Sequence, residues 1–206
     1  FDSFLSFYVC FREVFITMLS DVIKKYGGEK MDPLDVYKDI FRIGEGFIQK
    51  EFEDSGSFKA NPIAYYKNEN EEHGHFRIMF EDKFEEIYRN ELVNADFCVM
   101  NGLTYFGAKY TSDRASKMCA MIFDIDGVTD KSLNNFFYAA FNKEFDYYPL
   151  PNYVALSGHG IHLYYVFEEP VPLFPNLKLQ LKEFKYSLTE KMWNKNTSID
   201  KKVQKQ

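Results

Sequence analysis

Hydrophobic and polar residues alternate in two stretches of the second half of the chain, and this alternation predicts β-strands. In MIFDIDGV, Met121, Phe123 and Ile125 fall on one face of a strand. Asp124 and Asp126 fall on the other face, because successive side chains of a strand point in opposite directions. The pattern therefore predicts two carboxylates that leave the sheet together, with Cα atoms about 6.5 Å apart.

The second stretch, YVALSGHGIHLYYVF, predicts two strands joined by a tight turn over residues 157–160. Alternation places His162, Tyr164 and Val166 on one face of the second strand. Two glycines allow the turn to adopt backbone angles that point successive N–H groups at an anion. Ser157 and an imidazole add further donors, so the turn suits a phosphate.

Helical spacing predicts two helices near the N-terminus. Residues 1–26 carry apolar side chains at this spacing and predict one amphipathic helix that ends at Gly27 and Gly28. A second helix is predicted to begin at Asp32, before a proline suited to the first helical position, and to run towards Phe52.

Shorter elements are predicted between these helices and the acid-bearing strand. Strands are expected at residues 63–66 and in HFRIMF, and a helix is expected over residues 81–93. The stretch DFCVMNGLTYFGAKY predicts a hairpin that turns at Asn101 and Gly102, a dipeptide favoured in hairpin turns.

Two more helices are predicted after the acid-bearing strand, over residues 131–142 and from Pro175 onward. The last helix is expected to bury one stripe of four side chains, namely Leu177, Leu181, Phe184 and Leu188. Strands interleaved with helices favour an α+β or mixed α/β domain.

The length and composition limit the class of protein. A chain of 206 residues can bury one full core, or a core with an appended subdomain. No uninterrupted apolar run approaches the roughly 20 residues that span a bilayer, so we expect no membrane segment. Three scattered cysteines form neither a disulfide framework nor a zinc pattern, which favours a reducing cytoplasm. The chain starts without Met and stops abruptly at Gln206, so we expect a piece of a longer protein.

The net charge of −6 argues against a nucleic-acid partner, because phosphate backbones are normally met by a basic surface. The charge is unevenly distributed, however. Residues 178–206 carry eight Lys against three acids, a local excess of +5. A basic C-terminal segment beside an acidic metal site suits a polymerase-like enzyme, and a solvated lysine-rich helix is the structural alternative.

The paired acids and the glycine turn together indicate a chemistry. Two carboxylates held side by side can bind a pair of divalent ions about 3.5–4 Å apart. Beside a phosphate-binding turn they describe a nucleotidyl-transfer site, in which the protein positions a triphosphate and neutralises developing charge. Asp200, in SIDKK, follows an apolar residue in another expected strand and can supply a third carboxylate. Lys109, Arg114 and Lys117 precede the acid-bearing strand and are candidate cations for the triphosphate.

The motifs FDID, SGHGIH and SID, in this order, resemble the catalytic core of archaeo-eukaryotic primases. The resemblance is to the primase-polymerase branch found in plasmids, phages and other mobile or defence elements. It covers roughly residues 97–206 and implies an RRM-like catalytic sheet, truncated at its C-terminus if the chain is a fragment. Residues 1–96 would form an N-terminal helical or α+β region packed on this core.

The resemblance also implies roles for individual residues. Mg²⁺ or Mn²⁺ would be held by Asp124, Asp126 and Asp200. The phosphates would be held by Ser157, Gly158 and His162, with Lys117 and Arg114 as further candidates. The implied enzyme adds NTPs or dNTPs to a nucleic-acid strand on a single-stranded or primed DNA template, and either starts strands de novo or only extends them. A helicase or other replication or defence proteins are expected partners.

Two other functions are compatible with parts of the pattern. FDIDGV also resembles the first motif of HAD-type phosphohydrolases, in which Asp124 would be the nucleophile and Asp126 the acid/base. That interpretation leaves SGHGIH unexplained. A primase-like module that binds nucleotide or nucleic acid without catalysis is the third possibility.

Overall fold

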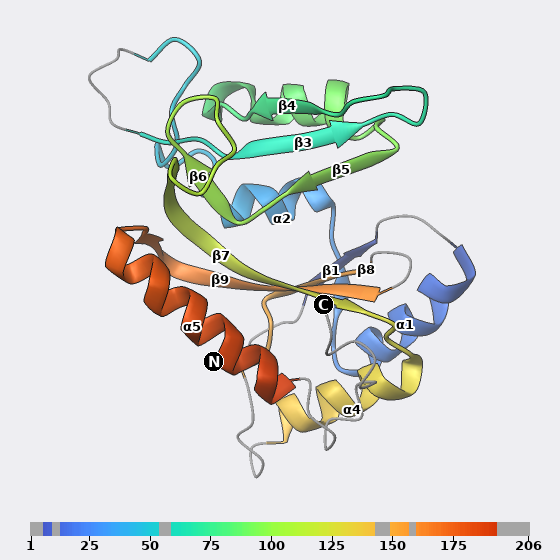
Figure 1. The fold of residues 1–206 in the computed structure, drawn as a ribbon. Helices are drawn as coiled ribbons and strands as arrows, with labels where there is room; N and C mark the ends of the chain where they lie inside the picture. Colours follow the sequence, from blue (N-terminus) through green and yellow to red (C-terminus); the bar gives the residue numbers. More distant parts are fainter. Residues whose placement is uncertain (1–5, 10–12, 54–58, 143–148, 157–159, 193–206) are drawn as a thin grey trace. The chain divides into compact units, whose positions relative to one another are not determined.

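The computed structural model describes residues 6–9, 13–53, 59–142, 149–156 and 160–192 (Figure 1). Its elements follow one another in the order β1 (Ser6–Val9), α1 (Glu13–Lys25), β2 (Glu29–Lys30), α2 (Pro33–Ile40), β3 (Ile63–Lys67), β4 (His75–Ile78), η1 (Glu81–Lys83), α3 (Phe84–Ile87), η2 (Tyr88–Leu92), β5 (Phe97–Met100), β6 (Leu103–Tyr105), β7 (Ala115–Asp126), α4 (Asp130–Phe141), β8 (Tyr153–Leu156), β9 (Gly160–Pro172) and α5 (Pro175–Met192). This mixture of helices and sheets confirms the predicted α+β class.

The chain forms two compact units, each assembled from segments that are distant in the sequence. Unit 1 comprises residues 1–33, 121–166 and 178–206, and unit 2 comprises residues 34–120 and 167–177. The long strands β7 and β9 each begin in one unit and end in the other. The boundary expected between residues 96 and 97 falls inside unit 2.

Residues 121–126 of the acid-bearing strand β7 lie in unit 1, where they belong to a split β-α-β arrangement. The sheet order is β2-β1-β8-β9-β7-β6, and β8 and β9 form the predicted antiparallel hairpin (Figure 1). The first residue of β9 lies beside Ile125, at the end of β7. Leu173, which follows the last residue of β9, donates its N–H to the carbonyl of Ser116 at the start of β7. β7 and β9 are therefore antiparallel. β7 and β8 are therefore parallel, joined through α4 and separated by β9.

The N-terminal segment differs from the single helix predicted over residues 1–26. Residues 6–9 form β1, which pairs in parallel with both β2 and β8. Pairing with strands distant in sequence overrides the helical spacing there, and the prediction was wrong for these residues. The end of α1 was predicted correctly, because Gly28 N–H donates to Ile23 and Gly27 N–H donates to Lys24, which is a Schellman motif.

Helix α4 confirms the helix predicted over residues 131–142. Thr129 caps its N-terminus in a reciprocal pair of hydrogen bonds with Ser132. Three apolar side chains of its inner face are buried, namely Leu133, Phe136 and Phe137. Tyr26, just after α1, contacts the Phe137 and Phe141 rings with centroids 5.5 and 5.4 Å away, which ties the two helices together.

Unit 2 contains a three-stranded antiparallel sheet in the order β4-β3-β5. Its strands β3 and β4 confirm the predictions at residues 63–66 and in HFRIMF. Residues 81–92 are helical as predicted, in consecutive 3₁₀, α and π turns. They bury three apolar side chains, Phe84, Ile87 and Leu92.

The hairpin predicted at Asn101 and Gly102 was wrong. β5 pairs with β3 in the three-stranded sheet, whereas β6 pairs with β7 in the other sheet. The carbonyl of Gly102 accepts the N–H groups of Cys119 and Ala120 at 2.7 and 3.2 Å. A Cβ atom at Gly102 would lie 2.3 Å from the Ala120 carbonyl oxygen, so the glycine is needed for close approach between backbones.

The second helix is shorter than predicted. α2 ends at Ile40 instead of continuing towards Phe52. Gly44 and Gly46 follow with positive φ values of 99° and 71°, and both donate their N–H groups to Glu81 Oε1, at 3.1 and 2.7 Å. A buried carboxylate from a distant helical segment thus holds the loop that replaces the expected helix.

Candidate active site

The two acids lie where the strand pattern placed them. Met121, Phe123 and Ile125 are buried, and the Asp124 side chain between the last two keeps 64% of its surface exposed. Asp126 is the last residue of β7, and Gly127 follows with φ of 68°. Since Asp124 and Asp126 share a face, both carboxylates leave the sheet on the same side.

His162 joins the hairpin motif to the acid motif. Its Nε2 atom lies 3.2 Å from Asp124 Oδ1. The hydrogen bond that His162 donates lowers the pKa of Asp124, against the raising effect of partial burial. The electrostatic effects of His162 and of Lys185 lower this pKa further. Asp124 is therefore held as a carboxylate whose Oδ1 atom is oriented by an imidazole.

Gly160, the second glycine of the predicted turn, has a steric role. A Cβ atom on it would lie 2.0 Å from the Ile125 carbonyl oxygen and 2.9 Å from the Asp126 Cα atom. Its φ lies outside the left-handed region, so close packing and not unusual backbone angles requires the glycine. Gly160 therefore lets β9 approach the end of β7 at the two acids.

Lys185 is a member of the site that the sequence reasoning missed. Its Nζ atom lies 5.4 Å from the Phe123 ring centroid, although the residue as a whole stays exposed. Partial burial lowers the pKa of Lys185, and the charge of Asp124 opposes this effect. Helical spacing places Lys185 on one helix face with Leu181 and Leu188, but it does not show which residues of the sheet that face meets.

The buried stripe predicted for α5 was wrong at one position. Leu188 is 8% exposed, and Leu177 and Leu181 are partly buried, but Phe184 is 56% exposed. The helix is rotated so that Lys185 and not Phe184 lies towards Asp124.

Three predicted site residues fall outside the described residues: Ser157, Gly158 and Asp200. Their assigned roles stay predictions.

The predicted cations Lys117 and Arg114 belong to unit 2. Lys117 Nζ lies 4.7 Å from the ring centroid of Phe47, and Arg114 Nε lies 3.6 Å from Asp113 Oδ2. A contact of either residue with a triphosphate also stays a prediction.

The donor set suits a hard divalent cation. Asp124 and Asp126 offer carboxylate oxygens, and magnesium is commonly bound by one or two carboxylates together with substrate phosphates and water. Within the described ranges no three His, Cys, Asp or Glu side chains form a metal-binding group. The site defined by these ranges is therefore a two-carboxylate site, to which Asp200 is the predicted addition.

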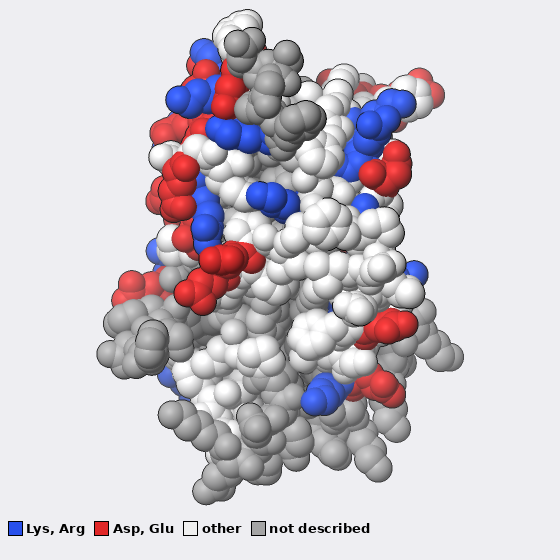
Figure 2. All heavy atoms as spheres, turned by 90° about the vertical axis from the view of Figure 1, so that its left-hand side faces the viewer, with Lys and Arg blue, Asp and Glu red and all other residues white. Residues whose placement is uncertain are grey.

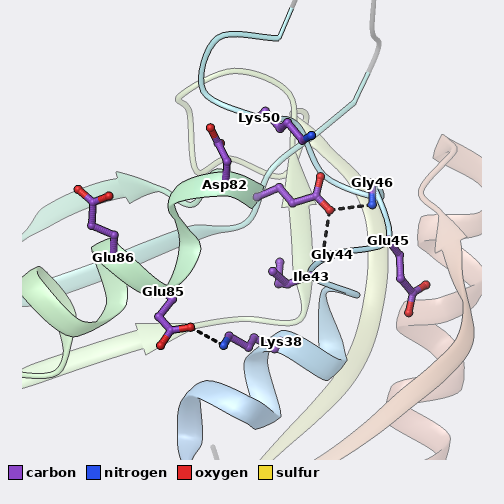
Figure 3. Close-up of a pocket in the computed structure, with 10 residues that line it drawn as sticks. Lys38, Ile43, Gly44, Glu45, Gly46, Lys50, Asp82, Glu85 and Glu86 are labelled. Carbon is purple, nitrogen blue, oxygen red and sulfur yellow. Dashed lines mark hydrogen bonds and ion pairs between the residues drawn. The ribbon is translucent and has the colours of Figure 1, made fainter.

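A groove is formed within unit 2, and none of the candidate site residues lines it. It encloses about 780 Å³ and is lined by both acids and lysines, including Lys38, Lys50 and Glu85 (Figure 3). The Lys38 ammonium donates to Glu85 at 2.6 Å. Glu81 Oε1 accepts hydrogen bonds from the two loop N–H groups, and Glu81 Oε2 is buried and has no hydrogen-bond partner among the described residues. These contacts hold the loop after α2, and we assign the groove no ligand.

Charges are mixed on the surface shown in Figure 2. Lys and Arg side chains are interspersed there with Asp and Glu, and do not form one continuous basic area. A polyanionic partner on this face would therefore meet charges of both signs.

No family model, curated protein or solved structure gives a significant match to the chain. Of the helices that the structure describes, none has the length and apolar character needed to cross a bilayer. The functional assignment therefore depends on the residues and their geometry.

Proposed function

We propose that the chain is the catalytic part of a primase-polymerase, which adds NTPs or dNTPs to a nucleic-acid strand by two-metal-ion chemistry. The observation that carries this proposal is the 3.2 Å contact between His162 and Asp124. It joins two sequence motifs, FDID and SGHGIH, that were interpreted independently as a metal site and a phosphate site. The steric fit of Gly160 against the acid-bearing strand supports the same pairing.

The topology of unit 1 supports an RRM-like core. The elements β7, α4, β8, β9 and α5 follow the first five elements of a β-α-β-β-α-β fold, with β9 between the two parallel strands. A strand around Asp200 would be the sixth element. Its carboxylate would then come from the strand that completes this arrangement.

The chain's own residues have distinct tasks in this proposal. Asp124 and Asp126 would hold Mg²⁺ or Mn²⁺, which when bound would neutralise triphosphate charge and promote attack of a hydroxyl on the α-phosphate with release of pyrophosphate. His162 orients Asp124, as hydrogen-bonded partners of metal-binding carboxylates do. Lys185 places a positive charge near the carboxylate, and Gly160 keeps the strands close enough for these groups to meet.

The lowered pKa keeps Asp124 ionised, as a metal ligand requires and as the nucleophile of the HAD-type alternative also requires. The observation that favours the primase-polymerase is therefore the contact between the two motifs, because the HAD-type alternative leaves SGHGIH unexplained.

Extension of a labelled primer on a DNA template tests the proposal. The parent chain should extend the primer in Mg²⁺ or Mn²⁺, and the double variant Asp124→Asn/Asp126→Asn should not. A matched control is Glu168→Gln/Glu169→Gln, which changes two exposed acids at the other end of β9. Phosphatase activity of the parent that depends on Asp124, without extension, would instead establish the phosphohydrolase. Nucleotide binding with neither activity would identify a non-catalytic module.

A further inference from the structure

One face of the three-stranded sheet in unit 2 is rich in aromatic residues. Tyr65 lies directly opposite Phe76 on β4 and Val99 on β5, and Lys67 lies opposite Phe97. Residues paired in this way share a face. The strand positions of this face are Ile63, Tyr65, Lys67, Phe76, Ile78, Phe97 and Val99. We call Tyr65, Phe76 and Phe97 the aromatic face.

The rings of the aromatic face form a continuous series. The Tyr65 centroid lies 6.1 Å from that of Phe97 and 5.1 Å from that of Phe76. Tyr110 extends the series, with its centroid 5.6 Å from that of Phe76. Phe76 and Phe97 nevertheless remain 57% and 55% exposed. Large apolar side chains are usually exposed singly, and a connected series of them indicates a binding surface.

Two tyrosines hold one end of the series in place. Tyr105 and Tyr110 have ring centroids 4.9 Å apart, and the Asn101 side-chain amide donates to both hydroxyls at 2.7 Å. Tyr105 is 4% exposed, so this end is anchored in the core of unit 2. The Tyr110 end of the series is therefore held by a hydrogen bond and by packing against Tyr105.

The charge of this face selects a class of ligand. Among its described strand positions Lys67 is the only charged residue, in a protein of net charge −6. The Lys67 ammonium donates to the backbone carbonyl of Glu72 at 3.2 Å, which is a neutral acceptor. The strand positions of this face carry a cation and no acid, while Glu69, Glu71 and Glu72 follow in the loop after β3 and Asp96 precedes Phe97. Exposed rings with a cation among them suit a ligand that combines flat rings with negative charge.

We propose that the aromatic face binds single-stranded nucleic acid, with bases stacked on Phe76 and Phe97 and a phosphate near Lys67. Proteins that bind single strands combine aromatic side chains, on which successive bases stack, with cations that follow the backbone. This surface lies wholly within unit 2. The inference goes beyond the proposed catalytic site and does not require catalysis, because binding alone is claimed.

Fluorescence anisotropy of labelled oligothymidylate and oligouridylate, in EDTA so that no nucleotide transfer occurs, tests the inference. Phe76→Ala and Phe97→Ala should each weaken binding by about fivefold to a hundredfold, the range expected for loss of one stacked base. Lys67→Gln should reduce the slope of log affinity against log salt concentration by about 1, the change expected for loss of one phosphate contact. Phe52→Ala is the matched control, because Phe52 is a 90% exposed phenylalanine of unit 2 outside the three strands.

Each outcome supports or overturns the inference. Weaker binding by both aromatic variants, with the control unchanged and thermal melting by circular dichroism preserved, supports it. Equal affinity of all variants, or no binding by the parent, overturns it. Self-association of the parent that both aromatic variants abolish would assign the face to a second copy and also overturn it. Binding is measured in EDTA on the aromatic variants and extension is measured on the Asp124→Asn/Asp126→Asn variant, so failure of this inference and failure of the proposed activity are distinguishable.

Discussion

The close approach of β9 to the end of β7 makes Gly160→Ala an informative substitution. The added carbon would lie 2.0 Å from the Ile125 carbonyl oxygen, whereas ordinary contacts begin at 3.4 Å, so the two backbones must separate by about 1.4 Å. Both sides of the contact are backbone and cannot rotate away. Overpacking of this kind costs about 1–3 kcal/mol. The smaller unfolded-state entropy of alanine offsets only about 0.4–1 kcal/mol of that cost.

The same movement should affect catalysis, because the displaced backbone carries Asp126. A misplacement of about 1 Å can lower a rate on the order of a hundredfold. Urea unfolding followed by circular dichroism measures the stability, and primer extension measures the rate. We expect Gly160→Ala to unfold at a lower urea concentration than the parent and to extend the primer more slowly.

Gly107→Asn is the control for Gly160→Ala. Gly107 has φ of 72°, and no atom of the described part of the chain lies within 4 Å of an added Cβ. Asparagine tolerates the left-handed region. The stability of Gly107→Asn should stay within about 0.5 kcal/mol of the parent. If Gly160→Ala unfolds at the same urea concentration as the parent, the close contact inferred between β9 and β7 is wrong.

Two further predictions concern carboxylates. His162→Ala removes the hydrogen bond that lowers the pKa of Asp124, so the ¹³C-detected carboxyl titration of Asp124 should move up towards the ordinary value of about 3.9. The stability that the His162–Asp124 pair contributes is present above the pKa of Asp124 in the unfolded state and is lost as the pH falls through its lower pKa in the folded state. An unchanged titration of Asp124 in His162→Ala would argue against the hydrogen bond. Glu81→Ala leaves two loop N–H groups without their acceptor and should cost about 1–3 kcal/mol in urea unfolding. Glu81→Gln keeps an oxygen there and should cost less, and equal losses would mean that this oxygen does not hold the loop.

Strands and helices that have one apolar face and one polar face could be predicted from the sequence. The alternation of Phe123, Asp124 and Ile125 depends only on the two-residue period of a strand, and the structure reproduces it. The start of α4 was similarly predictable, because Thr129 caps it through residues only three positions away. In both cases the information is local.

Elements decided by distant contacts could not be predicted in this way. Residues 6–9 are a strand because β2 and β8 offer partners, and Gly102 packs against Ala120 instead of turning a hairpin. The inward position of Lys185 depends on how α5 rotates over Phe123 and Asp124, which helical spacing alone does not determine. Whether a glycine is needed for its backbone angle or for close packing also depends on which distant segment lies against it. Gly160 is needed for close packing against β7.

The most direct test of the proposed activity is single-nucleotide addition to a primer opposite each of the four template bases. If Asp124 and Asp126 form the metal site of a primase-polymerase, the parent should add only the complementary nucleotide in each case. The Asp124→Asn/Asp126→Asn variant should add none, while Glu168→Gln/Glu169→Gln should behave as the parent. Addition that ignores the template, or equal addition by the variant without these two carboxylates, would contradict the proposal.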